Sequence, residues 1–309
     1  MPNGLPPSDS THLSDLQRSE MIEHYGGVVD GQFAKDSIMR RFVNVQPVRG
    51  TDTLIDRRVG RPKLQRLTDG VRPDAQKTNF GRVAVTVTET ILARDSRSQL
   101  NEFQTDFGAR AILGREHGKE LGKFFDECLL IQAIKGAYQA APALPDYNGA
   151  FGAGQVRALA AANNDLDPDL LYAQIASIIT AQQEADIDTD SSAVFVRPTH
   201  YDVLLNNDKL IDRDFSSENG DFANGKVKTI KGVPIVMTTR IPTAAIPNHL
   251  QGSAYNVSAQ EALTVAIVTH PSSLLVGETI PLESDVWFDK KERVWFIDSF
   301  ISFGAAPRR

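Results

Sequence analysis

Cysteine is almost absent from this chain of 309 residues, which contains only Cys128. One thiol excludes an intrachain disulfide and a thiolate metal cluster, and it suits a reducing compartment such as a bacterial cytoplasm. Long apolar runs are also absent, since no stretch approaches the roughly 18 residues of a membrane-spanning helix. The start of the chain is polar and proline-rich, without the pattern of a signal peptide. We therefore expect a protein that stays in solution and has no membrane partner.

The motifs of familiar enzyme sites are missing as well. The sequence has no Gly-x-x-x-x-Gly-Lys-Ser/Thr phosphate loop, no Gly-x-Ser-x-Gly elbow, and no two histidines at the i, i+4 spacing that binds one metal ion. Asp126 and Glu127 are a poor catalytic pair, because adjacent helix positions do not face each other. We expect no catalytic residue, cofactor or metal site, although a diffuse carboxylate site stays open as an alternative.

Charge is unevenly distributed along the chain. The net charge is −6, yet residues 49–82 hold nine basic and four acidic residues, a local charge of +5 that leaves −11 on the remainder. Valines alternate on both flanks of this segment, while glycine and proline interrupt its interior, which predicts a long two-stranded ribbon. An isolated ribbon is only marginally stable in water, so we expect this one to lie on an acidic neighbouring subunit.

Nucleic acid is the alternative partner of the ribbon, because its cations could neutralise phosphates. Acidic residues are interspersed within it, however, and no aromatic residue that could stack on bases occurs between Arg49 and Asn79. The sequence therefore favours protein contact. The candidate contact residues are Arg49, Arg57, Arg58, Arg61, Lys63, Arg66 and Arg72.

Two stretches before residue 140 have helical periodicity. Residues 13–25 predict a short amphipathic helix that ends at Gly26-Gly27, and residues 101–139 predict a long helix with an irregularity near Gly108. Cys128 lies on the apolar face of the long helix, so we expect it to be a core residue and a poor nucleophile. Three glycines recur every fourth residue upstream and favour close backbone packing against a neighbouring element: Gly114, Gly118 and Gly122.

The second half of the chain mixes helices and strands. Residues 141–164 are rich in alanine, glycine and asparagine and predict a linker or mobile loop. Asp167 as N-cap and Pro168 at the first helical position then predict a helix. A strand at 193–196 and a helix opened by Pro198 follow. Further strands are expected at 226–230, 233–238, 263–268, 274–276, 286–288 and 294–303, so the fold class is α+β with a largely antiparallel sheet.

Residues 224–236 form a distinctive local pattern: a strand, an Ile-x-Gly turn and a second strand, followed by Ile241-Pro242. Residues 195–201 combine a strand end, a proline and a tyrosine, and residues 303–308 close the chain with a strand and a Gly/Pro-containing tail. Together with the order of arm, basic ribbon, long helix and mixed lobe, these segments resemble the Hong Kong 97 capsid fold of tailed phages. The sequence is most similar to the major capsid proteins of T-seven-like podoviruses.

This resemblance implies a division of the chain. The expected parts are an N-terminal arm (1–45), an E-loop (46–90), a P-domain with the spine helix (91–165), an A-domain (166–264) and the return strands of the P-domain and A-domain (265–309). About 45 residues precede the ribbon, too few for the scaffolding extension of some relatives, so a separate scaffolding protein is expected. Lys63 and Lys77 lie in the E-loop, but no crosslinking partner can be named for them.

The resemblance also implies a function. We expect a virion structural protein that self-assembles in the host cytoplasm into hexamers and pentamers of an icosahedral shell, with E-loop cations contacting a neighbour. Its expected partners are other copies, a scaffolding protein, a portal protein, a possible decoration protein and double-stranded DNA bound without sequence specificity. Two alternatives stay open: an encapsulin-like nanocompartment shell without DNA, and an enzyme that forms a small oligomer of fixed size.

Overall fold

The computed structural model describes residues 15–59, 64–72, 80–98, 108–139, 154–159, 161, 163–207, 210, 220–221, 226–227 and 229–308. The chain divides into two compact units. Unit 1 comprises Met1–Ile38, Thr90–Phe125 and Ile280–Ser302, and unit 2 comprises Met39–Glu89, Asp126–Thr279 and Phe303–Arg309. Three long elements run from one unit into the other: α4 (Gly108–Tyr138), β11 (Leu274–Asp289) and β12 (Val294–Pro307).

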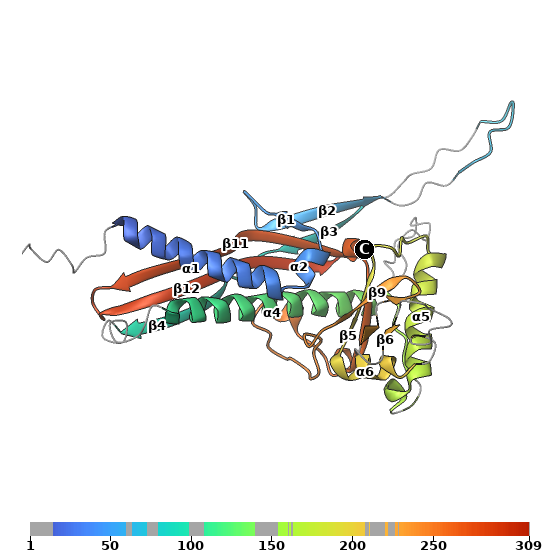
Figure 1. The fold of residues 1–309 in the computed structure, drawn as a ribbon. Coiled ribbons are helices and arrows are strands. Elements are labelled where there is room, and N and C mark those ends of the chain that lie inside the picture. The colour runs from blue at the N-terminus through green and yellow to red at the C-terminus, as the bar shows by residue number, and fades with distance from the viewer. Residues whose placement is uncertain are drawn as a thin grey trace, which may run out of the picture. The chain divides into compact units, whose positions relative to one another are not determined.

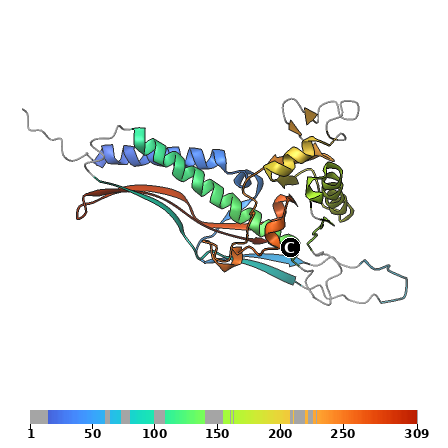
Figure 2. The same cartoon turned by 90° about the horizontal axis from the view of Figure 1, so that it is seen from below.

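Unit 1 consists of two helices packed on one face of a sheet. Helix α1 (Asp15–Asp36) and the first part of α4 cover β4 (Ile91–Ser98) and the adjoining parts of β11 and β12, as Figure 2 shows from below. Strands β4 and β12 pair antiparallel, with Ser98 opposite Val294 and Ile91 opposite Ile301. The buried cluster between the layers contains Tyr25, Val29, Val286 and Ile297.

Helix α1 does not end at Gly26-Gly27, and that expectation was wrong. The helix continues past Gly27 to Asp36, since Tyr25, Val29 and Phe33 all lie buried on one of its faces. The burial of three large side chains at helical spacing outweighs the low helix propensity of glycine.

The glycine stripe of α4 packs closely on α1, as the sequence predicted. A Cβ atom at Gly118 would lie 2.5 Å from the carbonyl oxygen of Val29, and one at Gly114 would lie 3.1 Å from the Tyr25 ring. At Gly122 the contact is looser, with the Phe33 carbonyl oxygen at 3.6 Å. The missing side chains therefore allow the backbones of the two helices to approach each other.

Unit 2 contains a four-stranded sheet in the order β10-β5-β9-β8, a two-stranded ribbon and two longer helices (Figure 1). In the sheet, β5 pairs parallel with β9 and antiparallel with β10. Its core is formed by side chains of β5, of the helices α5 and α6, and of the β8–β9 hairpin. The bounds are α2 (Met39–Phe42), β1 (Val45–Pro47), β2 (Thr53–Val59), β3 (Phe80–Thr86), η1 (Asn164–Leu166), α5 (Pro168–Glu184), β5 (Ala193–Val196), α6 (Pro198–Leu205), β6 (Gly220–Asp221), β7 (Lys226–Val227), β8 (Thr229–Ile230), β9 (Val233–Met237), η2 (Ser253–Tyr255), η3 (Glu261–Leu263), β10 (Ala266–Thr269) and η4 (Pro271–Ser273).

Several local predictions are confirmed in unit 2. The Asp167 carboxylate accepts hydrogen bonds from the backbone N–H groups of Asp169 and Leu170, at 3.0 and 3.2 Å, and caps α5. The β8–β9 hairpin turns at Lys231 and Gly232, whose φ angles of 47° and 83° fit the two-residue turn that matches strand twist.

The strands after residue 260 differ from expectation. The strands expected at 274–276 and 286–288 are one continuous strand, β11, because the intervening polar residues Thr279, Glu283 and Asp285 occupy its exposed face. Leu263 belongs to the short helix η3, not to the following strand. Residues 101–107 and most of 141–164 lie outside the described residues. The mixture of helices with largely antiparallel strands confirms the α+β class.

Candidate assembly surface

The basic ribbon is formed by β2 and β3, which pair antiparallel from Thr53 opposite Thr86 to Val59 opposite Phe80 (Figure 1). Since side chains alternate between the two faces of a strand, the ribbon has an inner and an outer face. The inner face rests on its own chain. A Cβ atom at Gly277 would lie 3.3 Å from Leu54, and one at Gly304 would lie 2.9 Å from Val85.

An ion pair completes this anchorage of the ribbon. The Arg308 guanidinium donates to both carboxylate oxygens of Asp56, at 2.7 and 3.3 Å. The base of the ribbon is thus held within unit 2 by apolar contacts and one charge pair.

The outer face presents cations to solvent. Arg57 lies directly opposite Arg82, and both side chains are exposed. Ile55, on the same face, is 51% exposed. Like charges directly opposite each other on a strand pair are destabilising, and this face has no carboxylate of its own among the described residues to offset them. Carboxylates from another molecule would relieve the repulsion.

The structure places only part of the predicted contact set. Arg49, Arg57, Arg66 and Arg72 are exposed, while Arg61, Lys63 and the side chain of Arg58 lie outside the described residues. Sequence reasoning left Arg82 out of the set, although it faces Arg57. Arg82 is one of the nine basic residues counted in this segment. Its position opposite Arg57, however, depends on the register of β2 and β3, which the sequence does not specify. Three exposed apolar side chains near Arg66 and Arg72 were also overlooked: Leu64, Leu67 and Val71.

A second surface lies on the face of the unit 1 sheet that α1 and α4 leave open. Arg94 donates two hydrogen bonds of 2.7 Å to Asp298, and the Trp287 indole N–H donates to the same carboxylate at 2.9 Å. Burial raises the pKa of Asp298, but the bonds from Arg94 and Trp287 outweigh it and leave that pKa below its usual value. The charges of Arg94 and Asp298 therefore cancel on this part of the open face.

Asp126 and Glu127 do not form a catalytic pair. Asp126 is 1% exposed and accepts a hydrogen bond from the Met39 backbone N–H at 3.0 Å, and its other oxygen lies 3.3 Å from the Arg240 guanidinium. Burial raises the pKa of Glu127. The adjacent Cys128 is fully buried, and burial raises the pKa of its thiol well above its ordinary value, so the expectation of a core cysteine is confirmed.

One row of side chains has the order hydroxyl, imidazole, carboxylate. The Thr199 hydroxyl lies 3.2 Å from His200 Nδ1, and His200 Nε2 lies 2.9 Å from Asp165. The hydrogen bond to His200 lowers the pKa of Asp165. The row joins η1 to α6, and none of the three residues lines the cavity beside His270 or the one formed by residues 67–71. A structural role accounts for it.

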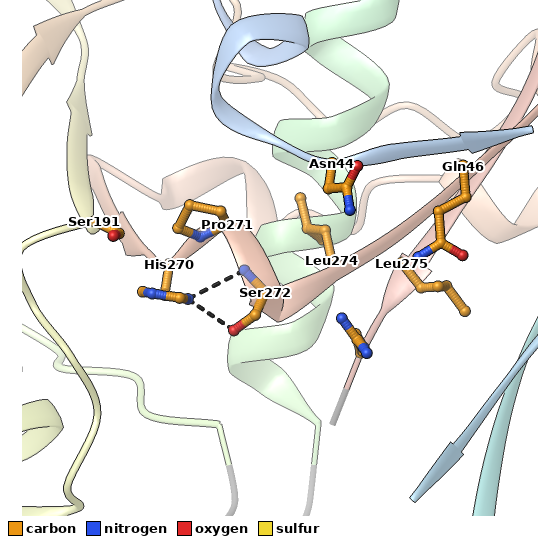
Figure 3. A pocket seen from close by; sticks show the side chains of 9 residues that line it. Asn44, Gln46, Ser191, His270, Pro271, Ser272, Leu274 and Leu275 are labelled. Atoms are coloured by element: carbon orange, nitrogen blue, oxygen red, sulfur yellow. Dashed lines mark hydrogen bonds between the residues drawn. The ribbon is translucent and has the colours of Figure 1, made fainter.

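A cavity of about 250 Å³ in unit 2 is lined by both polar and apolar side chains (Figure 3). His270 and Ser272 hydrogen-bond to each other there, at 2.7 Å, and the Arg308 guanidinium that borders it is paired with Asp56. Within the described part of the chain, no group of three His, Cys, Asp or Glu residues could hold a metal ion. No described helix combines the length and apolarity needed to cross a bilayer.

Solved structures similar to this chain include phage capsid proteins and the protein of a virus-like particle. A chain in the asymmetric unit of the bacteriophage PhiM1 mature capsid is 26% identical, with a TM-score of 0.75 over 88% of this chain and 84% of that one. A chain from the capsid of cyanophage P-SCSP1u is 15% identical, with a TM-score of 0.77 over 88% and 85%. A virus-like particle from Pyrococcus furiosus gives 13% identity and a TM-score of 0.51 over 94% and 96%. No protein-family model and no curated protein sequence matches the chain.

These comparisons confirm the fold expected from the sequence. The chain is an α+β protein with the Hong Kong 97 capsid fold. They also support the expected function, that of a phage major capsid protein, and the neighbours are structural proteins.

Proposed function

We propose that this chain is the major capsid protein of a tailed phage, of which identical copies form the hexamers and pentamers of an icosahedral head around double-stranded DNA. The observation that carries the proposal is the similarity to the PhiM1 capsid chain, which extends over 88% of this chain at 26% identity. A likeness of that extent covers most of both chains. No catalytic role is part of the proposal.

The proposal extends to the partners. A T-seven-like podovirus is the source that the sequence resemblance favours, with a separate scaffolding protein, a portal protein and a possible decoration protein as partners. The domain boundaries stay as expected from the resemblance: arm 1–45, E-loop 46–90, P-domain 91–165, A-domain 166–264 and return strands 265–309. Assembly would take place in the bacterial cytoplasm, and the packaged DNA would be bound without sequence specificity.

The E-loop cations form the inter-subunit contact in this proposal. The exposed, like-charged pair Arg57 and Arg82 and the exposed Arg49, Arg66 and Arg72 support it, because a face of this charge lowers its free energy by meeting carboxylates of a neighbour. Arg58, Arg61 and Lys63 belong to the same proposed contact on sequence grounds.

An encapsulin-like nanocompartment shell is the second candidate. The coverage of 94% of this chain by the Pyrococcus furiosus particle keeps it open, although the TM-score of 0.51 is lower than for the phage capsids. Both candidates are closed shells of one chain, so they differ in contents and not in architecture.

Sizing the purified protein by light scattering and electron microscopy tests the proposal. Shells are expected, and the ratio of absorbance at 260 and 280 nm from particles formed during infection should indicate packaged DNA. Empty or protein-filled shells would favour the nanocompartment. A small oligomer of fixed size under all assembly conditions would overturn both candidates.

A further inference from the structure

The ribbon is joined to the rest of its chain by two short connections. Residues 48–52 lead from β1 into β2, and residues 87–90 lead from β3 into β4. Gly50 in the first connection has a φ of 76°, in the left-handed region that favours glycine. The Val87 N–H donates a hydrogen bond to the Asp52 carbonyl oxygen, at 2.9 Å, and so links the two connections. Connections this short keep the ribbon near the body, but they do not by themselves fix the direction in which it leaves.

Two glycines of the body receive the inner face of the ribbon. A Cβ atom at Gly304 of β12 would lie 2.9 Å from Val85 and 3.1 Å from the Thr86 carbonyl oxygen. One at Gly277 of β11 would lie 3.3 Å from Leu54. Val85 is only 4% exposed within the single chain. Gly277 and Gly304 therefore form a glycine seat, against which the ribbon lies at a distance that no larger residue would allow.

A charged contact lies on the same face of the ribbon. Asp56 is two residues beyond Leu54 on β2, so both side chains point to the inner face. The Arg308 guanidinium donates to the two carboxylate oxygens of Asp56, at 2.7 and 3.3 Å. The Arg308 backbone N–H donates to the Ser273 carbonyl oxygen at 2.6 Å. Arg308 is thus tied to the body by its backbone and to the ribbon by its side chain.

The Arg308 side chain also has an alternative place to lie. It borders the cavity of about 250 Å³, which is lined by Asn44 and Gln46 as well. The amide oxygens of these two side chains are able to accept hydrogen bonds from a guanidinium group. The side chains of Arg308 and Asp56 are 37% and 21% exposed, so water competes for both. An ion pair in this setting opens and closes at small cost in free energy.

We infer that the Arg308–Asp56 ion pair is a latch that fixes the direction in which the ribbon leaves its own subunit, with the glycine seat as the surface on which it closes. With the latch closed, an unassembled subunit presents its ribbon in one orientation. With the latch open, the ribbon pivots about residues 48–52 and 87–90. A preoriented segment loses less conformational entropy when it meets a partner, so the closed latch favours association. This consequence for assembly rests on the proposed function, whereas the latch itself does not.

The distance between two spin labels in the full-length, unassembled chain measures the direction of the ribbon. One label is attached at Ala84→Cys on the exposed face of β3 and the other at Ala173→Cys on the exposed side of α5. The substitution Cys128→Ala in the background removes the remaining thiol. Double electron–electron resonance should give one narrow distance peak when the latch is intact. Arg308→Gln and Asp56→Asn should each cause the loss of this single narrow peak.

Three further variants separate the latch from other causes. The exchanged pair Asp56→Arg/Arg308→Asp should restore the narrow peak, because it re-forms the ion pair with the signs reversed. Gly304→Ala should shift the peak without any change of charge, since the added Cβ atom displaces Val85. The control Arg57→Gln removes the same charge from the outer face and should leave the peak unchanged. Circular dichroism and thermal unfolding establish that each variant is folded.

A narrow peak in Arg308→Gln together with a shifted peak in Gly304→Ala would overturn the latch, because the glycine seat alone would then fix the direction of the ribbon. Assembly provides the second readout. Arg308→Gln should slow shell formation roughly two- to fivefold, about the factor by which a partly exposed ion pair shifts an equilibrium. An unchanged assembly rate in spite of a broadened distance distribution would overturn the consequence for assembly. If wild type forms no shells under any condition, the proposed function fails, and the distance measurement still decides the latch.

Discussion

At the scale of single residues, Gly118 controls how closely α1 approaches the spine helix α4. A Cβ atom there would lie 2.5 Å from the Val29 carbonyl oxygen, a backbone atom that cannot move aside alone. We expect Gly118→Ala to lower the free energy of unfolding of the subunit by about 1–3 kcal/mol, the usual cost of overpacking. Urea unfolding followed by circular dichroism measures it.

Gly31 of α1 provides the matched control, because a Cβ atom added there meets nothing within 4 Å. In this exposed helix interior, Gly31→Ala should raise the free energy of unfolding by roughly 0.5–1 kcal/mol. Equal effects of the two substitutions would show that α1 does not rest on Gly118.

Cys128 should contribute to the packing of the core and should not act as a reactive thiol. It is 0% exposed, and burial raises the pKa of its thiol. Cys128→Ala should cost on the order of 1 kcal/mol or slightly more of unfolding free energy, from the small cavity it leaves, and shells should still form. Rapid reaction of the native protein with a thiol reagent would contradict this burial.

At the scale of elements, the sequence predicted those whose determinants are local. Asp167 with Pro168 places the start of α5, and the Lys231-Gly232 turn places the β8–β9 hairpin, because a cap or a turn depends on a few consecutive residues. The length of α1 and the continuity of β11 depended on contacts with α4 and on which face is solvated, and local patterns do not contain that information.

The sequence likewise predicted only part of the candidate surface. Local charge identified the ribbon and most of its exposed cations. It did not pair Arg57 with Arg82, because the register of two strands joined by a long connection is decided by packing, here of Leu54 and Val85 on Gly277 and Gly304.

The ribbon as an element should be needed for assembly and dispensable for the fold of the body. Deletion of residues 50–80 removes β2 and most of the basic segment, while the cores of both units retain their main clusters. We expect a folded monomer or small oligomer with near-native circular dichroism that forms no shells in light scattering. Normal heads from this deletion would show that the ribbon is not an assembly contact.

At the scale of the whole molecule, the separation of charge between the ribbon and the remainder, +5 against −11, makes assembly sensitive to salt. Exposed ion pairs are each worth only about 0–1 kcal/mol and are screened over about 8 Å at physiological ionic strength. Such pairs steer subunits towards each other more than they hold a finished shell, which depends mainly on buried apolar contacts.

Assembly from purified subunits with scaffolding protein should therefore slow as salt rises, while mature heads tolerate the same salt. Light scattering over time measures the first, and electron microscopy of heads after incubation measures the second. Arg57→Glu with Arg58→Glu should stall assembly without unfolding the subunit, because attraction to a neighbour's carboxylates becomes repulsion. If the assembly rate is flat from low to high salt and this double variant assembles normally, electrostatic steering has no part in the process. The contact between copies must then depend on apolar side chains such as Ile55.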